Sequence, residues 1–212
     1  MRTDFHVLRY ASMLAPLLLA GCLGGGTSEP QQRYYAIAPA SVEATAPASA
    51  DGPHIVLDAV DARGIYAERS LLYRAAADAA PLEQYSYASW AEPPDVMLQD
   101  LMMSALRGAF GATQVLAPGQ RGPWSIRVSV RLHAMEQIRD GSSARAHFAA
   151  TFTALDRNGA VLFVLDFDRE APASGASPLE YVNALSGLVD DADREVVDRL
   201  REVAAKASSP GA

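Results

Sequence analysis

Residues 124–133 read Trp-Ser-Ile-Arg-Val-Ser-Val-Arg-Leu-His, an alternation of apolar and polar side chains that decides how this chain folds. A period of two places alternate side chains on opposite faces of a β-strand. The residues expected on the buried face are Trp124, Ile126, Val128, Val130 and Leu132. A dry face opposite a wet face is typical of an antiparallel strand that covers a core on one side.

Two further strands with the same alternation are expected downstream. After a turn at Asp140-Gly141, the apolar positions are Ala146, Phe148, Ala150, Phe152 and Ala154. Asn158-Gly159 is a strong hairpin signal. The strand after it carries on one face Val161, Phe163, Leu165 and Phe167. The pattern predicts a meander of three long antiparallel strands.

Shorter β-favouring runs come before the meander. They cover residues 33–37, 54–60, 69–74, 83–87 and 114–116. The runs at 69–74 and 83–87 are separated by turn-forming residues around Pro81, and together they look like a hairpin. The sheet is therefore expected to contain these short strands beside the meander.

The hydrophobic period changes in two places, and each change predicts a helix. From Pro93 onward, apolar side chains at spacings of three and four form one stripe. This stripe consists of Leu98, Leu101, Met102, Ala105, Leu106, Ala109 and Phe110. The nearby methionines, Met97, Met102 and Met103, are expected to fill the core rather than to hold a ligand.

The second helix is longer and closes the chain. Ser177-Pro178-Leu179-Glu180 fits a capping box with proline at the first helical position. Its apolar seam consists of Val182, Leu185, Val189, Ala192, Val196, Leu200 and Val203, and its other face is densely charged. A mainly antiparallel sheet packed against two helices predicts a single α+β domain.

The N-terminus has the features of a lipoprotein signal peptide. Arg2 and Arg9 precede a short apolar run, which ends in Leu-Ala-Gly-Cys at Cys22. We expect cleavage after residue 21 and acylation of the Cys22 thiol, which would anchor the mature chain in a membrane. The alternative is a buried cysteine in an ordinary helix. Leu23 stands where aspartate would favour retention in the inner membrane, so the outer membrane is favoured, with the domain facing the periplasm.

Residue composition divides the rest of the chain into a tether, a domain and a short tail. Residues 22–32 are expected to be the acylated cysteine and a flexible tether, residues 33–206 the domain, and residues 207–212 a disordered tail. Residues 39–53, rich in alanine, proline and serine, are expected to form a surface loop. The net charge of −7, without a basic block, argues against binding to nucleic acid.

Residue patterns typical of catalysis are missing from the sequence. It contains no glycine-rich phosphate loop, no Gly-x-Ser-x-Gly elbow and no paired metal motif, so we expect no catalytic residues, no metal and no cofactor. His133 and His147 flank the Asp140-Gly141 turn and could face each other across the hairpin, with Glu136 as a third ligand. Ordinary surface histidines are the simpler interpretation.

Two segments resemble the ABC-type transport auxiliary lipoproteins. One is the strand ending in Leu71-Leu72-Tyr73-Arg74. The other is the tyrosine-rich strand that runs into a tryptophan and an acidic-proline step, from Tyr85 to Pro94. The lipobox, the Tyr34-Tyr35 start of the domain and the long terminal helix also match the order of elements in that family.

The resemblance implies a role by binding, not by catalysis. Members look like accessory parts of MCE-type lipid transport systems, in which an inner-membrane ABC transporter works with periplasmic MCE-domain proteins. The chain would then dock the periplasmic assembly at the outer membrane. Aromatic side chains are favoured at interface centres, which makes Tyr85, Tyr87, Trp90 and Pro93 the candidate contact surface. The alternative for Trp90 and Tyr85 is that they pack against the helix that follows.

Other functions remain open at this point. The chain could itself carry a lipid or another apolar ligand, which would need a cavity near Leu101. It could also be a structural lipoprotein of the cell envelope. Self-association through the long helix or the edge strands is compatible with the sequence, and the transported substrate is not encoded in any recognisable motif.

Overall fold

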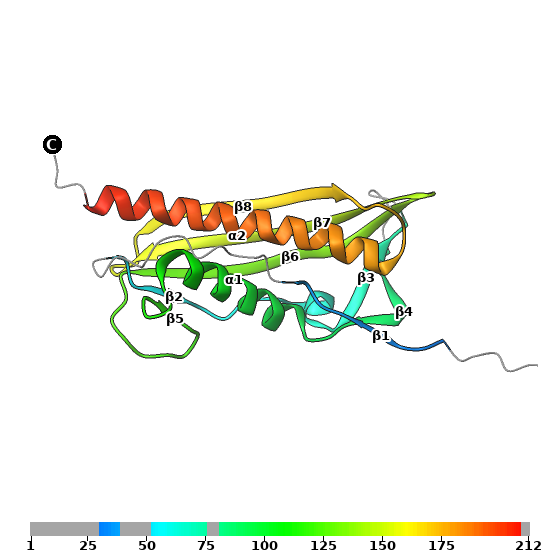
Figure 1. Ribbon diagram of the computed structural model, residues 1–212, viewed down its shortest axis with the longest axis horizontal. Coiled ribbons are helices and arrows are strands. Elements are labelled where there is room, and N and C mark those ends of the chain that lie inside the picture. The colour runs from blue at the N-terminus through cyan, green and yellow to red at the C-terminus, as the bar shows by residue number, and fades with distance from the viewer. Residues whose placement is uncertain (1–29, 39–51, 76–80, 209–212) are drawn as a thin grey trace, which may run out of the picture. The chain divides into compact units, whose positions relative to one another are not determined.

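The computed structural model describes residues 30–38, 52–75 and 81–208, and the fold is that of the unit Gln32–Ala212. An open sheet of eight strands carries two α-helices, α1 (Pro94–Phe110) and α2 (Pro178–Ser208) (Figure 1). The α+β class with a single domain is confirmed. The signal peptide and Cys22 lie outside the described residues. No described helix has both the length and the apolar composition needed to cross a bilayer.

Three long strands form the meander that the alternation predicted. They are β6 (Ile126–Asp140), β7 (Ser143–Asp156) and β8 (Val161–Pro172), and they pair antiparallel in that order. Both connecting turns contain a glycine with positive φ, 59° at Gly141 and 85° at Gly159. Such a conformation is easy only for glycine, which explains why the chain reverses at these positions.

The shorter strands make the sheet mixed. They are β1 (Arg33–Tyr35), β2 (Ile55–Leu57), β3 (Ser70–Arg74), β4 (Glu83–Trp90) and β5 (Val115–Leu116). The β3–β4 hairpin is confirmed, with a register shift between Ser70 and Leu72. However, β2 and β3 both pair parallel with β6, near its beginning and near its end. The parallel pairs β1–β4 and β2–β5 extend the sheet from there.

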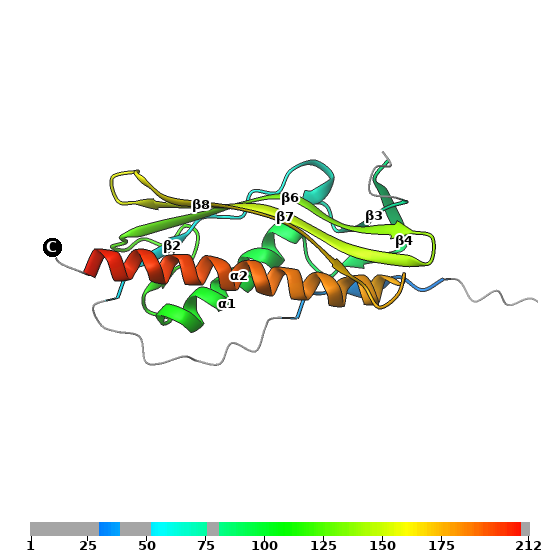
Figure 2. The same ribbon diagram turned by 90° about the horizontal axis from the view of Figure 1, so that it is seen from above.

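Both helices cover the same face of the sheet, as Figure 2 shows from above. The capping box of α2 is present: the Glu180 carboxylate accepts bonds from the Ser177 backbone N–H and hydroxyl at 3.0 and 2.7 Å. The Glu180 N–H in turn donates to the Ser177 hydroxyl oxygen at 3.4 Å. Two otherwise unpaired donors at the helix start are thereby satisfied. The helix continues to Ser208, beyond the expected end of the domain at residue 206.

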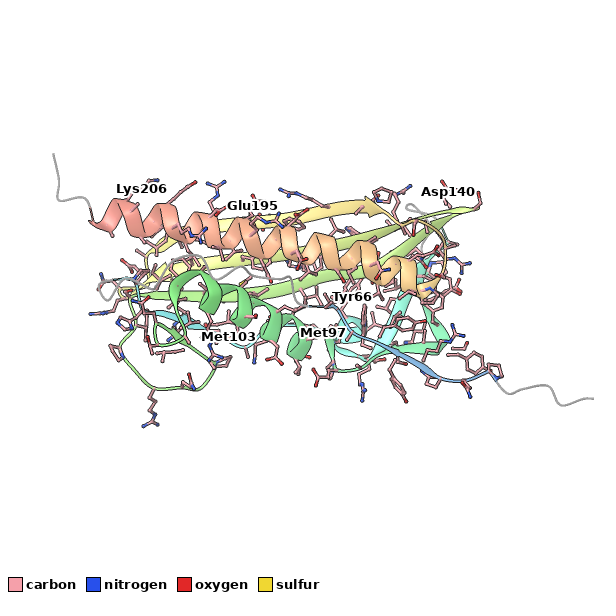
Figure 3. All side chains as sticks on the ribbon, viewed as in Figure 1. Tyr66, Met97, Met103, Asp140, Glu195 and Lys206 are labelled. Atoms are coloured by element: carbon pink, nitrogen blue, oxygen red, sulfur yellow. The ribbon has the colours of Figure 1, made fainter. Side chains whose placement is uncertain are left out.

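One continuous core fills the space between the sheet and the helices. Leu101 and Met102 from α1 are 8% and 1% exposed, and they belong to the same cluster as Phe148 and Leu185. Met97 and Met103 also turn into this core from α1 (Figure 3). The thioether of Met97 accepts a bond from the Ile37 N–H at 3.4 Å. The methionines therefore fill the core, as predicted.

A bulge in β6 changes which side chains face the helices. Before it, Leu132 stands opposite Ala150, and after it Met135 stands opposite Phe148, with the register shift between Leu132 and Ala134. The core-facing positions thus change from even to odd numbers. An unbroken alternation would place Glu136 in the core, but the bulge turns this carboxylate to the polar face of the sheet.

Candidate functional site

The four residues expected to contact a partner occupy different environments. Trp90 at the end of β4 is 1% exposed and packs against Tyr181 of α2, with the ring centroids 6.2 Å apart. Its backbone N–H donates to the Arg69 carbonyl at 2.7 Å. The indole therefore belongs to the core, and it joins the tyrosine strand to the terminal helix.

Tyr85 is half-buried and also packs against the core. Its hydroxyl donates to the Gln137 side chain on β6, and its ring lies 4.8 Å from that of Tyr73. Burial raises the pKa of Tyr85. The Gln137 amide donates onward to the Ala176 carbonyl at 3.3 Å, just before α2. This chain of bonds connects β4, β6 and the entry to the terminal helix.

Tyr87 is the accessible aromatic residue of the four. It is 52% exposed, and it lies on the solvent side of β4, where the neighbouring Ala88 is buried. Pro93, partly buried, precedes α1 and offers its carbonyl to the Met97 N–H at 3.1 Å. Of the candidate residues, only Tyr87 presents a large part of an aromatic ring to a binding partner.

A second group of functional side chains lies on the polar face of the meander, around Glu136. This carboxylate is 2% exposed and forms an ion pair with Arg74 from β3. It also accepts a bond from the hydroxyl of Tyr66, which belongs to a short 3-10 helix at Gly64–Ala67 (labelled in Figure 3). Burial alone would raise the pKa of Glu136, but its partners His147, Arg74 and Tyr66 lower the pKa to about 2.

His147 on β7 extends this group across the sheet. Its Nδ1 lies 3.6 Å from Glu136 Oε1, an ion-pair distance, and its Nε2 lies 2.9 Å from Asp168 Oδ1 on β8. The two carboxylates, Glu136 and then Asp168, raise the pKa of His147, although burial opposes them. A carboxyl group with a pKa of about 2, such as Glu136, is too weak a base for proton abstraction near neutral pH. The arrangement is suited to holding three strands together.

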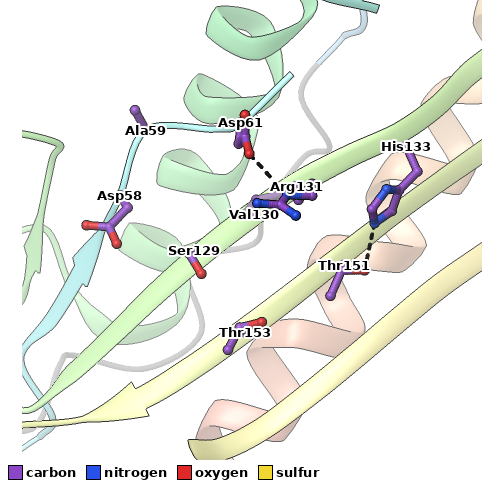
Figure 4. Close-up of a pocket in the computed structure, with 9 residues that line it drawn as sticks. All are labelled: Asp58, Ala59, Asp61, Ser129, Val130, Arg131, His133, Thr151 and Thr153. Carbon is purple, nitrogen blue, oxygen red and sulfur yellow. Dashed lines mark hydrogen bonds and ion pairs between the residues drawn. The ribbon is translucent and has the colours of Figure 1, made fainter. Parts of the chain in front are cut away.

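A cleft of about 500 Å³ opens further along the same face (Figure 4). Its lining comes from the segment after β2 and from β6 and β7: Asp58, Ala59, Asp61, Ser129, Val130, Arg131, His133, Thr151 and Thr153. Arg131 and Asp61 form an ion pair of 3.0 Å. Most of the residues that line the cleft have polar side chains, and the cleft lies on the face opposite the helices.

The hydrogen bonds in this cleft fix the direction of one histidine contact. The Thr151 hydroxyl donates its single proton to Asp166 at 2.8 Å. It must therefore accept from His133 Nε2, which lies 2.8 Å away. The Thr151 hydroxyl thus connects His133 to Asp166. The group is a hydrogen-bonded ladder across β6, β7 and β8.

His133 and His147 do not face each other. The turn after Asp140 pairs Asp140 with Ser143, and this register sets Glu136 opposite His147. His133 falls in the β-bulge and bonds to Thr151 instead. In the part of the chain that the structure describes, no three His, Cys, Asp or Glu side chains are grouped so that they could hold a metal. The alternative of a histidine pair that faces across the hairpin is therefore wrong.

Sequence reasoning did not find the partners of Glu136. Tyr66 and Arg74 lie far from it in sequence, and only the parallel pairing of β3 with β6 brings them to it. The one usable signal was a carboxylate at a position where the alternation of β6 expects an apolar residue. Two groups inside the α2 seam were also missed: Tyr181, whose buried hydroxyl has no hydrogen bond among the described residues, and Asp193.

Comparisons with known proteins agree with this architecture. A family model described as "ABC-type transport auxiliary lipoprotein component" matches residues 35–197. A crystal structure of a Xanthomonas campestris protein of the family DUF330 is similar with a TM-score of 0.65 and 16% identity, covering 83% of this chain and 98% of that chain. Another, of an uncharacterized protein, has a TM-score of 0.63 and 12% identity, with 80% and 99% covered. Such low identity shows the fold alone. No curated protein matches.

Proposed function

The chain belongs to the ABC-type transport auxiliary lipoprotein component family, and from this premise we propose that it is the membrane-anchored accessory lipoprotein of an MCE-type lipid transport system. It would act by binding. Held at the outer membrane by acylated Cys22, with its domain in the periplasm, it would dock an MCE-domain protein that works with an inner-membrane ABC transporter.

The observation that carries this proposal is the extent of the family match. Residues 35–197 run from the last residue of β1 into α2, so the match covers most of the domain and not one motif. The polar groups on the open face of the sheet support a role in binding. Glu136 bonds to Tyr66, His147 to Asp168 and Thr151 to Asp166, so these groups connect neighbouring segments of the sheet.

The anchor follows from the sequence at Cys22. Ten residues separate this cysteine from Arg33, the first residue of β1. A chain of that length reaches at most ~35 Å, so the domain would be kept close to the lipid surface. Acyl chains on one residue meet the requirement for stable membrane attachment.

Co-purification tests the proposal. The full-length lipoprotein, tagged at its C-terminus, is extracted in mild detergent after chemical crosslinking, and the recovered proteins are identified by mass spectrometry. We expect an MCE-domain protein to be enriched over an unrelated outer-membrane lipoprotein with the same tag. Recovery of no MCE-domain protein above that control would contradict the docking role. Adjacent genes for an ABC permease, an ATPase and an MCE protein are expected as well.

A further inference from the structure

The surface formed by β1 and β4 carries two exposed tyrosines beside the point where the tether enters the domain. Tyr34 is 65% exposed and Tyr87 is 52% exposed. The parallel register sets Tyr34 beside Ser89, and Tyr87 comes two residues before Ser89 on the same strand. Ala88 and Trp90 on the other side of β4 are buried. Tyr34 and Tyr87 are therefore exposed rings on two adjacent strands.

A cation completes this surface. The Arg69 guanidinium carbon lies 5.9 Å from the centroid of the Tyr34 ring. Arg69 donates to the Trp90 carbonyl at 3.2 Å and to the Ala91 carbonyl, which hold the side chain in place. None of the ion pairs between described residues uses Arg69, so its charge has no carboxylate partner among them, and it has further N–H donors.

We infer that Tyr34, Tyr87 and Arg69, here called the tyrosine patch, rest on the headgroup region of the bilayer that holds the acylated Cys22. Tyrosine is favoured at this depth because its ring is apolar and its hydroxyl remains hydrated. A guanidinium can bond phosphate oxygens at the same level. The inference rests on the anchor in the proposed function.

The tether supplies the reason to favour a membrane over a protein. Ten residues separate Cys22 from Arg33, and a chain of that length reaches at most ~35 Å. Arg33 begins β1 and Tyr34 follows it, so the tyrosine patch would lie within that reach of the acylated cysteine. The net charge of −7 does not attract the domain to anionic lipid. The patch would therefore orient the domain while the acyl chains retain it, leaving the far end of the sheet for the periplasmic partner.

A single-cysteine labelling experiment tests this orientation. Cys22 is the chain's one cysteine, and acylation consumes its thiol, so an introduced cysteine is labelled uniquely. Full-length lipoprotein carrying Tyr87→Cys is labelled with an NBD fluorophore and reconstituted into phosphatidylethanolamine–phosphatidylglycerol vesicles. The vesicles contain lipid with a nitroxide near the headgroup. The matched control is Val161→Cys, at a residue 61% exposed where β8 begins, at the other end of the sheet from β1 in Figure 1.

We expect the fluorophore at position 87 to be quenched roughly twofold or more relative to position 161, because nitroxide quenching needs near contact with the interface. Equal quenching in vesicles that float with acylated protein overturns the inference and leaves the anchor standing. Protein that does not float overturns both.

A second variant distinguishes a protein partner from the membrane. Tyr34→Ser combined with Tyr87→Ser removes both rings without touching the core, and it should still co-purify the MCE-domain protein. Loss of that partner, together with equal quenching at positions 87 and 161, would make the patch a protein contact. Preferential quenching at position 87 without any MCE-domain partner would leave the orientation intact and contradict the docking role.

Discussion

Glu136 on β6 and His147 on β7 stand directly opposite each other, with 3.6 Å between Oε1 and Nδ1. The second imidazole nitrogen of His147 reaches Asp168 on β8, so one side chain links all three strands of the meander. Glu136 is also bound by Arg74, which ends β3, and by Tyr66, which belongs to the 3-10 helix before β3. This network connects the short strands to the meander by charge, and its stability should depend on pH.

Replacing Glu136 by glutamine should remove the charge at the centre of this network. We expect Glu136→Gln to lower the free energy of unfolding at neutral pH by ~1–3 kcal/mol, because Arg74 and Tyr66 lose a charged acceptor. The folded pKa of about 2 lies below the usual 4.5. The carboxylate therefore contributes stability above pH 4.5 that is lost as the pH falls toward 2.

Urea unfolding between pH 2 and 7 measures this effect. The wild-type protein should lose more stability than Glu136→Gln over the acid window. Glu170→Gln is the matched control, since Glu170 is exposed and pairs with Arg145 at 2.7 Å on the same sheet face. That control should change stability by less than ~1 kcal/mol. Parallel acid profiles for the wild type and Glu136→Gln would contradict the assignment.

The charge on His147 should be measurable directly. Glu136 and Asp168 raise its pKa above the usual 6.5. The imidazolium therefore contributes stability that is fully present below pH 6.5 and is lost as the pH rises through the folded pKa. Asp168→Asn should lower the pKa of His147, as followed by NMR titration of the imidazole. Asp140→Asn, an exposed carboxyl at the turn, should leave it unchanged. Equal titration curves in both variants would refute the contact.

Asp193 should reduce the stability of the protein at neutral and alkaline pH. It is 9% exposed within the apolar seam of α2. Burial, and then the nearby Asp190, raise its pKa to about 8. The folded state therefore keeps a proton that the unfolded chain releases above pH 3.8, so stability falls as the pH rises from 3.8 to 8.

We expect Asp193→Asn to raise the free energy of unfolding by ~1–3 kcal/mol at pH 8 and to have little effect at pH 4. Asp198→Asn, on the exposed face of the same helix, is the control and should stay within ~0.5 kcal/mol. Thermal unfolding at the two pH values suffices. If Asp193→Asn raised the free energy of unfolding equally at pH 4 and pH 8, removal of the buried charge could not be the cause.

The apolar stripe on α1 can be tested by replacing one of its side chains with alanine. Leu101→Ala should destabilise the protein by ~2–5 kcal/mol, because Leu101 is 8% exposed within the packed core. Val96→Ala on the same helix is the control, at 40% exposure, and should cost ~0.5 kcal/mol or less. Similar unfolding midpoints for the two variants would show that the core does not depend on Leu101.

The anchor has a simple test in cells. Cys22→Ala removes the only thiol available for acylation and should release the protein from the membrane fraction. Gly24→Ala, within the tether, should leave the protein membrane-bound. Both variants are followed by membrane fractionation and by mass spectrometry of the N-terminus. A Cys22→Ala protein that still sediments with membranes would argue against a lipid anchor.

The elements themselves follow from local patterns. The alternation from Ile126 to Leu132 and the two glycine turns are sufficient to predict the meander, because side-chain period and turn conformation are local properties. The Ser177–Glu180 capping box marks the start of α2 for the same reason. Boundaries were less well predicted: the run 54–60 became only Ile55–Leu57, since ladder pairing with β6 limits the strand.

Sequence alone therefore determined the α+β class, the order of the main strands and helices, and many of the residues that fill the core. The tertiary structure decided how β2 and β3 pair with β6, because parallel partners distant in sequence leave no local signal. It also decided that the bulge after Leu132 turns Glu136 toward Arg74 and Tyr66, and that Trp90 packs on Tyr181 while Tyr87 stays exposed. A one-residue change of register reverses every side chain beyond it, and only the packed sheet shows where that change occurs.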